Sequence, residues 1–359
     1  MPELLNERIT MIKLNLYAED GILVDDRIFC ICRNMAMLYS VHYLTGEVNI
    51  IGNLPEEHFY IEQCSRKIVR WNDYLVITPY NAKYIHIYDM HNEKWERLDY
   101  PQNESYGRKY VEAFVYNDKV IMIGAFTPNI IELDMKTREI CIRNTYFEKY
   151  GNTDELFCRS GYGIIKDDLY IALAISNEVM KINMDSWEYD VIKVGAESDR
   201  FSGIAYDGNR FWISPRKDGD VLIWDGGCQC EKVNLPFELL EANYNFGGIY
   251  AYNNNIFLHG FEGEYSAVIN KNTRETRFNT RQYYFLRNVG EECVIGQEKN
   301  GELHIYKDTL NIYKVEIDEE ILDTVRRNIR EELIYDDRTL TYEKKFFDLR
   351  GFIDYIVNR

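Results

Sequence analysis

Arginine recurs at the same place in four successive segments of the sequence, just before a run of apolar residues that reads as a β-strand. The four residues are Arg66, Arg108, Arg159 and Arg200, and Lys67 and Lys109 follow two of them. A guanidinium group presents five N–H donors in a planar fork that suits a carboxylate or a phosphate. If these strand starts meet in space, the sequence predicts a binding site for an anionic ligand.

Aromatic residues occupy the corresponding positions in the later segments. They are Phe201, Phe246, Tyr283 and Tyr284. Flat rings beside guanidinium groups suit a sugar ring or a base. The two sets together therefore predict a site for an acidic small molecule, a glycan or an acidic peptide. The structural alternative is that each arginine pairs with a nearby Asp or Glu and packs along its aliphatic stem.

The elements that would position these residues repeat along the chain. Small polar turns precede seven short apolar strands and begin at Asp25, Asn72, Asn117, Asp167, Asp207, Asn253 and Gly290. A second set of turns is spaced by 46, 45, 49, 41, 46 and 36 residues and is marked by Gly46, Asn92, Thr137, Ser186, Gly227, Thr273 and Thr309. Asn, Asp and Gly favour tight hairpins because they tolerate a left-handed backbone. Four strands in each repeat of about 40–50 residues are typical of a β-propeller blade.

We therefore predict an all-β, seven-bladed β-propeller over residues 18–317. In a propeller the first strand of every blade starts at one mouth of a central channel, which would bring the arginines, lysines and aromatic residues together. Asp89 and Trp95 flank the second turn of one repeat, and partial copies of this pattern occur at Asp134, Asp185, Trp187, Trp224 and Asp225. In these residues the chain resembles kelch-type propellers, although their Gly-Gly doublet is missing. The resemblance implies a propeller and no particular activity.

The two ends depart from the repeat. Residues 1–17 contain an alternating segment at 8–16 that predicts an extra strand, which would extend an outer blade edge or help to close the ring. Residues 318–359 form a short C-terminal helical extension, with one helix that Asp318 would cap and a second over 342–357. The apolar stripe of the first helix is Ile321, Val325, Ile329 and Leu333, and that of the second is Tyr342, Phe346, Leu349, Ile353 and Ile356. Such a tail either packs on the propeller or binds a partner.

Composition narrows the choice of partners. The 359 residues carry a formal net charge of −17, whereas nucleic acids and anionic membranes attract basic proteins. The first residues lack the apolar run of a signal peptide, and the pairs Cys30/Cys32 and Cys228/Cys230 are too closely spaced for a typical zinc site. We expect a cytoplasmic monomer that binds neither nucleic acid nor membrane.

A metal site is an alternative use of the same channel. Oxygen ligands of the kind that lactonase-like propellers use occur at Glu19, Asp20, Glu112, Asn245 and Asn288. Residues 202–214 also resemble a strand pair from such enzymes. However, no specific ring of hard ligands is evident, and the six histidines include no H-E-x-x-H pattern. We predict no metal, no cofactor and no particular catalytic residue.

The sequence favours a non-enzymatic binding propeller that recognises a protein partner, an acidic small molecule or a glycan at the channel mouth. The alternative is a propeller enzyme, a lyase or a lactonase-like hydrolase, with its site in the central channel. Converging arginines distinguish the first hypothesis, and a divalent ion on channel carboxylates would distinguish the second.

Overall fold

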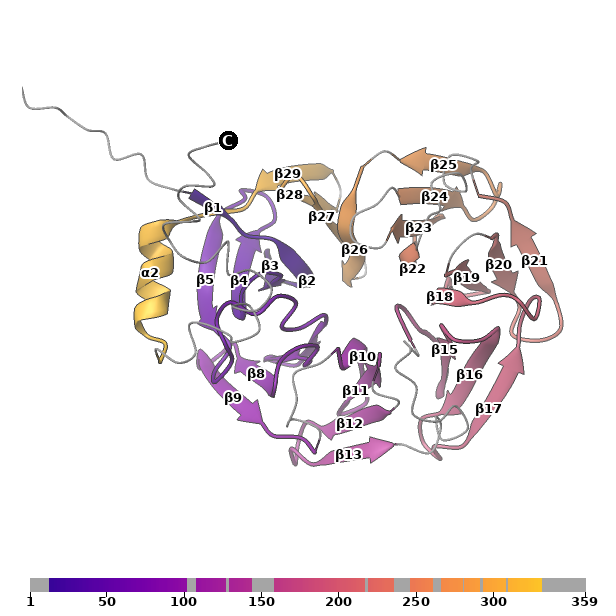
Figure 1. Cartoon of the computed structure of the whole chain (residues 1–359), viewed down its shortest axis with the longest axis horizontal. Coiled ribbons are helices and arrows are strands. Elements are labelled where there is room, and N and C mark those ends of the chain that lie inside the picture. Colours follow the sequence, from indigo (N-terminus) through magenta and orange to yellow (C-terminus); the bar gives the residue numbers. More distant parts are fainter. Residues whose placement is uncertain are drawn as a thin grey trace, which may run out of the picture.

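A computed structural model describes residues 13–101, 108–126, 129–143, 158–216, 219–235, 246–260, 266–279, 281–290, 293–307 and 309–330. Within these residues, seven four-stranded antiparallel sheets stand around a common axis as the blades of a propeller (Figure 1). The four strands of each blade follow one another in sequence order, from the inside of the ring to the outside. The prediction of an all-β, seven-bladed propeller is confirmed.

The blades are numbered in chain order. Blade 1 comprises β2 (Ala18–Val24), β3 (Arg27–Cys32), β4 (Met37–His42) and β5 (Val48–Asn53). Blade 2 comprises β6 (Ile68–Trp71), β7 (Tyr74–Ile77), β8 (Ile85–Asp89) and β9 (Lys94–Leu98). Blade 3 comprises β10 (Tyr110–Tyr116), β11 (Lys119–Gly124), β12 (Ile130–Asp134) and β13 (Ile140–Arg143). Blade 4 comprises β14 (Gly163–Ile165), β15 (Asp168–Ala172), β16 (Glu178–Asn183) and β17 (Tyr189–Lys193).

The remaining three blades have the same order. Blade 5 comprises β18 (Phe201–Tyr206), β19 (Phe211–Pro215), β20 (Val221–Trp224) and β21 (Cys230–Val233). Blade 6 comprises β22 (Phe246–Tyr252), β23 (Asn255–Gly260), β24 (Ser266–Asn270) and β25 (Thr276–Asn279). Blade 7 comprises β26 (Tyr283–Gly290), β27 (Cys293–Glu298), β28 (Glu302–Tyr306) and β29 (Leu310–Lys314).

The turn between the first and second strands adopts the predicted left-handed backbone in several blades. Asp25, Asn72, Asn117 and Asn253 have φ angles of 54°, 51°, 54° and 47°. These residue types tolerate positive φ because their short polar side chains can bond the local main chain. In blade 4 the left-handed residue is Lys166, one position before the predicted turn.

The turn between the third and fourth strands is capped in the same way by an Asp or Asn side chain in four blades. Oδ1 of Asp89, Asp134, Asn183 and Asn270 accepts hydrogen bonds from the backbone N–H groups two and three residues later, at 2.8–3.2 Å. This is the Asx turn that these residue types favour. In blade 4 the capping residue is Asn183, which corrects the expectation that Asp185 fills this position.

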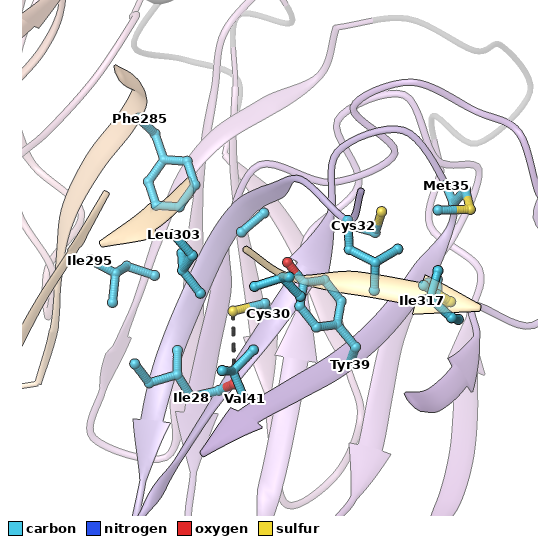
Figure 2. Close-up of a cluster of buried hydrophobic side chains, with 14 of the residues drawn as sticks. Ile28, Cys30, Cys32, Met35, Tyr39, Val41, Phe285, Ile295, Leu303 and Ile317 are labelled. Carbon is cyan, nitrogen blue, oxygen red and sulfur yellow. Dashed lines mark hydrogen bonds between the residues drawn. The ribbon is translucent and has the colours of Figure 1, made fainter. Parts of the chain in front are cut away.

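Hydrophobic side chains fill the spaces between neighbouring blades. The cluster between blades 1 and 7 includes Ile28 and Cys30 of β3, Tyr39 of β4, Ile295 of β27 and Leu303 of β28 (Figure 2). All eight cysteines are free thiols, and five of them are buried, which agrees with a structural role. Because both faces of a blade are covered, its strands alternate less clearly than those of a half-exposed sheet.

The two ends of the described chain meet beside blade 1. β1 (Lys13–Asn15) pairs with β30 (Glu316–Asp318) in a separate two-stranded sheet, with Leu14 opposite Ile317. The α-helix α2 (Glu319–Arg327) follows β30 and lies beside β5 (Figure 1).

The beginning of α2 differs from the prediction. Asp318 precedes the helix as expected, but its side chain makes no capping hydrogen bond. Leu322 of α2 and Ile329, two residues after the helix ends, are buried in the cluster between blades 1 and 7, so this side of α2 packs on the propeller. The predicted helix at 342–357 lies outside the described residues. No helix within them is long and apolar enough to cross a membrane.

Candidate functional site

The first strands of the blades begin at one end of the channel, and five of the seven are irregular there. Each of the five contains a β-bulge near its start, between Ala18 and Asp20, Tyr110 and Glu112, Phe201 and Gly203, Phe246 and Gly248, and Tyr283 and Phe285. A bulge adds one unpaired residue and redirects the side chains around it. The inserted residue is Glu19 in blade 1 and Tyr284 in blade 7.

Glu19 is the centre of a cluster of charges at this end of the channel. Arg33 Nη1 lies 2.5 Å from Glu19 Oε2, and Arg66 Nε lies 3.0 Å from Glu19 Oε1. The Arg33 guanidinium also lies over the Tyr284 ring at 4.4 Å, and the Arg66 guanidinium lies over the Tyr80 ring at 5.0 Å. Blades 1, 2 and 7 thus meet through one buried carboxylate and two arginines stacked on aromatic rings.

Asp20 and Glu112 form a second cluster with two cations. Lys67 Nζ lies 3.4 Å from Glu112 Oε2 and 3.9 Å from Asp20 Oδ2. Arg287 Nη1 lies 3.3 Å from Glu112 Oε1, and its Nε lies 3.7 Å from Asp20 Oδ1. The carboxylate side chains are at most 3% exposed, so these charges balance one another away from solvent.

The polar side chains of the channel also join blades to one another. Asp20 of blade 1 accepts a hydrogen bond from the Ile68 N–H in blade 2 at 3.0 Å. Glu112 of blade 3 accepts one from the Gly161 N–H, which precedes blade 4, at 2.9 Å. Ser202 of blade 5 donates to the Phe246 carbonyl of blade 6, and Gln297 of blade 7 accepts from the Ala18 N–H of blade 1 at 3.0 Å. At four junctions, these groups hold the ring together.

Burial and neighbouring charges shift the protonation of three groups in the channel. Burial raises the pKa of Asp20, and Lys67 and Arg287 offset that rise only in part. Burial would also raise the pKa of Glu112, but Lys67, Arg287 and the Gly161 N–H outweigh it and hold this pKa at about 2. Burial, with a smaller contribution from Arg287, lowers the pKa of His259 to about 3. At neutral pH Glu112 is therefore ionised and His259 is uncharged.

The predicted basic residues divide into three groups. Arg66 and Lys67 join the two ionic clusters, which agrees with the alternative that arginines pair with nearby carboxylates. Lys109 is buried, and its Nζ donates to the Ala82 carbonyl at 2.9 Å instead of facing a ligand site. Arg108 and Arg200 are exposed, and neither pairs with a carboxylate among the described residues.

The sixth basic residue, Arg159, is half-buried at the start of blade 4, and its charge contributes to the low pKa of His259. Arg159 therefore lies near the channel.

Most of the predicted aromatic residues are core residues. Phe201 and Phe246 are 1% exposed and pack between blades. Tyr283 is buried, and its hydroxyl lies 3.1 Å from both His304 Nδ1 and the Tyr306 hydroxyl. Tyr284 alone lies at the mouth, beneath Arg33. All four residues were predicted to bind ligand because each lies at the start of a first strand. Successive side chains of a strand point to opposite faces, however, so a residue at a strand start can face the core instead of the mouth.

The channel residues that sequence reasoning missed are Arg33, Arg287 and Gln297. Arg33 follows the end of β3, and Arg287 lies five residues into β26, so neither belongs to the stretch just before a first strand. The bulge in β26 alters which of its side chains enter the channel. The sequence signal that could have identified Arg287 is the presence of an arginine within an otherwise largely apolar first strand.

The proposed hard-metal set is only partly assembled. Glu19, Asp20 and Glu112 converge, but Asn288 is exposed on blade 7 and Asn245 lies outside the described residues. The converging carboxylates are neutralised by arginine and lysine, whose charges would repel a divalent cation.

One group of potential metal ligands lies elsewhere in the described chain, in blade 7. Ligand atoms of Glu298, Glu302 and His304 lie within 4.8 Å of one another. Arg281 Nη1 lies 2.7 Å from His304 Nδ1, so this nitrogen accepts a hydrogen bond and Nε2 carries the ring proton in the neutral form. Nε2 lies 3.3 Å from Glu302 Oε2, which makes it a donor to a carboxylate and not a metal ligand.

Solved structures share this fold at low sequence identity. Virginiamycin B lyase from Staphylococcus aureus superposes with a TM-score of 0.62 at 11% identity, covering 80% of this chain and 95% of that one. YCF48 from Cyanidioschyzon merolae gives a TM-score of 0.60 at 7% identity, with coverage of 82% and 96%. BamB from Moraxella catarrhalis gives 0.52 at 11% identity, with coverage of 86% and 91%.

Identities this low show the fold alone. No protein-family model matches the sequence, and no curated protein matches it. The similar structures named above are not kelch propellers, so the resemblance is confirmed only at the level of a seven-bladed propeller.

Proposed function

We propose that this chain is a non-enzymatic binding propeller whose mouth surface recognises an acidic segment of a protein partner. We define the mouth surface by arginine and aromatic residues within four positions of the start of a first strand or the end of a second strand, which is the same end of every blade; Tyr80 among them is buried beneath Arg66. Its members are Arg33, Arg66, Tyr80, Arg108, Phe126, Arg159, Arg200 and Tyr284. Arginine and aromatic residues are enriched where proteins bind one another.

The observation that carries the proposal is the pairing of arginine with aromatic rings on this one surface. The guanidinium groups of Arg33, Arg66 and Arg108 lie 4.4, 5.0 and 5.8 Å from the rings of Tyr284, Tyr80 and Phe126. Stacking orders the long side chains before any ligand arrives, which lowers the entropy lost on binding. Glu19 balances one of the two charges of Arg33 and Arg66, and the remaining positive charge together with that of exposed Arg108 and Arg200 gives this surface a local preference for acidic groups.

The inner channel supports binding at the surface in preference to chemistry inside. Asp20, Glu112 and Gln297 bond backbone groups of adjoining blades, and Lys67 and Arg287 neutralise the two carboxylates. Each of these groups is engaged in holding the ring, which explains why charged residues occupy the channel without a catalytic role. YCF48, which shares the fold, has been solved bound to a D1 peptide.

The test uses a fluorescently labelled hexaglutamate peptide and measures its fluorescence anisotropy with the full chain. Replacing the two exposed arginines, in the double variant Arg108→Ala/Arg200→Ala, removes charge without disturbing a buried ion pair. The binding free energy should weaken by roughly 1–3 kcal/mol for each charged hydrogen bond that is lost. Higher salt should weaken binding by the native chain more than binding by the variant.

The matched control is Arg70→Ala. Arg70 is exposed on β6 near the turn that leads into β7, at the opposite end of the blade from the mouth. If Arg70→Ala, which removes one charge, weakens binding by at least half as much as the double variant, which removes two, the peptide binds through general charge attraction and the mouth site is rejected. Preference for an acidic metabolite or glycan over the peptide would keep the surface but change the ligand class.

A channel enzyme is the second candidate. Asp20 and Glu112 share Lys67 and Arg287, yet their pKa values move in opposite directions, which is a pattern found in acid–base pairs. The fold is also that of virginiamycin B lyase. An inactive variant of that lyase has been solved with quinupristin, so incubation of this chain with quinupristin, followed by mass spectrometry, tests this candidate. Conversion by the native chain that is lost in a folded Glu112→Gln variant would favour a lyase over the binding propeller.

The proposal includes a monomer in the cytoplasm and a kelch-like origin of the blades. Exposed and buried thiols without disulfides agree with a reducing compartment. Light scattering of the purified chain measures its oligomeric state, and a dimer would contradict this part of the proposal.

A further inference from the structure

A groove lies on the outer side of blade 1, away from the channel mouth. It has a volume of about 670 Å³ and runs between α2 on one side and the edge of β5 with Trp95 of β9 on the other. Its apolar lining comprises Ile50, Ile51, Trp95, Ile321, Val325 and Ile329. An opening of this size with aliphatic and aromatic walls suits the apolar face of a helix.

Part of the apolar wall of the groove is exposed to solvent although α2 is already anchored on the propeller. Leu322 is 2% exposed and anchors α2 on the propeller, whereas Ile321 next to it is 48% exposed and faces the groove. An exposed isoleucine beside half-buried Ile50 and Trp95 forms a contiguous apolar area. Areas of this kind on a protein mark a docking site for another segment.

The described chain ends inside this groove. Asn328, Ile329 and Arg330 form part of its lining, and the guanidinium of Arg330 pairs with the Glu56 carboxylate on the opposite wall. The following residues, 331–359, therefore begin at the groove itself. Eleven residues, 331–341, separate Arg330 from the apolar stripe that starts at Tyr342, and such a linker spans up to about 40 Å.

The stripe consists of aromatic and aliphatic residues, as do the walls of the groove. Tyr342, Phe346, Leu349, Ile353 and Ile356 recur at three- and four-residue spacing, which places them on one face of a helix. A short tether gives the segment an effective concentration in the millimolar range, so it reaches the groove ahead of any untethered protein at lower concentration.

We infer that residues 342–357 form an amphipathic helix that docks in the groove between α2 and β5. The groove then holds part of this chain itself, and a partner protein gains access only by displacing the helix. This surface is distinct from the mouth surface, and the inference does not depend on the proposed function.

Hydrogen exchange of the full chain, read by mass spectrometry, tests the docking. In the native chain, amides of 342–357 should exchange at least about tenfold more slowly than those of an unstructured peptide, as expected for a segment docked nine-tenths of the time. The variant Phe346→Asp/Ile353→Asp should lose this protection and speed exchange in peptides covering Ile50 and Ile321. Ile321→Asp, on the groove wall, should release the same segment.

Lys344→Asp is the matched control, because it changes the net charge by −2 as the double variant does but lies on the opposite face of the helix. It should leave exchange unchanged. A synthetic 338–359 peptide added to the double variant should restore protection of the groove. The inference is overturned if the groove peptides exchange at the same rate in the native chain, in the double variant and in Ile321→Asp. Protection that appears only as protein concentration rises assigns the groove to a second copy and also overturns it.

Discussion

Replacing Glu112 by glutamine tests whether the buried ionic cluster holds the ring. Glutamine keeps the size of the side chain and can still accept the hydrogen bond from the Gly161 N–H. It removes the negative charge that Lys67 and Arg287 share, at 3.4 and 3.3 Å. Both cations have side chains less than a fifth exposed, so water cannot replace the lost carboxylate. Breaking a buried pair in this way is strongly destabilising, because it leaves an uncompensated charge.

The expected loss of unfolding free energy follows from the buried ion pair and from the pKa of Glu112. Removing one partner of a buried ion pair costs about 3–5 kcal/mol of unfolding free energy. The pKa of Glu112, held at about 2 instead of its ordinary 4.5, corresponds to about 3 kcal/mol of preference for the ionised form in the folded state. For a chain of 359 residues, such a loss lowers the Tm by about 4–7 °C.

Thermal unfolding followed by circular dichroism measures the loss, with Glu96→Gln as the control. Glu96 also pairs with an arginine, since Arg138 Nε lies 3.0 Å from its carboxylate, but its side chain is 41% exposed. A solvent-exposed pair contributes about 0–1 kcal/mol. The decrease in Tm should therefore be several-fold larger for Glu112→Gln than for Glu96→Gln. Equal changes in Tm would refute the account of the cluster as a buried structural tie.

The same pair of proteins gives a pH dependence with a defined sign. A carboxyl group whose folded pKa is depressed stabilises the fold above its ordinary pKa, and this stabilisation is lost as pH falls through the folded value. The stability difference between the native chain and Glu112→Gln should therefore shrink as pH falls from 4.5 to about 2. Asp20 is present in both proteins, but Glu112 contributes to its raised pKa, so the variant also moves the Asp20 pKa toward its ordinary value. A difference that stays constant over this range would contradict the assignment.

Two backbone positions give further predictions, both read by urea unfolding. At Gly161, where φ is +74°, an added Cβ would lie 2.4 Å from the Ile204 carbonyl oxygen, so Gly161→Ala should cost about 2–4 kcal/mol. Gly208→Ala has similar backbone strain but open space around it and should cost only about 1 kcal/mol, and equal costs would exclude close blade approach as the cause. Asn270→Ala removes the acceptor that caps the last turn of blade 6 and should cost about 1 kcal/mol, whereas Asn272→Ala, whose side chain is exposed, should cost less than half of that.

The repeat was predictable from sequence because each blade carries its own local information. Asn72 and Asn117 mark the first turns and adopt the left-handed backbone, and Asp89 caps a second turn. These interactions join residues within three positions of one another, so one sequence displays them directly. Seven repeats then fix the fold class even though no single repeat is distinctive.

The site was less predictable because it depends on contacts between blades. Lys67 and Arg66 were identified, but their partners Glu112 and Glu19 lie 45 and 47 residues away in sequence. Arg287 reaches Glu112 across 175 positions, and the bulge in β26 decides that it does so. Lys109, one position after an exposed arginine, faces the interior because alternate residues of an extended chain point in opposite directions.

Ring closure couples the two ends of the chain during its synthesis. β1 pairs with β30, and Ala18 bonds Gln297, so blade 1 acquires its last neighbour only when the final blade has emerged. At ribosomal speeds of about 5–20 residues per second, roughly 300 intervening residues take tens of seconds to appear. During that interval the apolar side chains of blade 1 that later pack against blade 7, among them Ile28 and Cys30, are exposed to solvent. Exposed apolar surface of this kind favours aggregation, so a chain that stalls before its last blade is complete is more prone to aggregate than the closed ring.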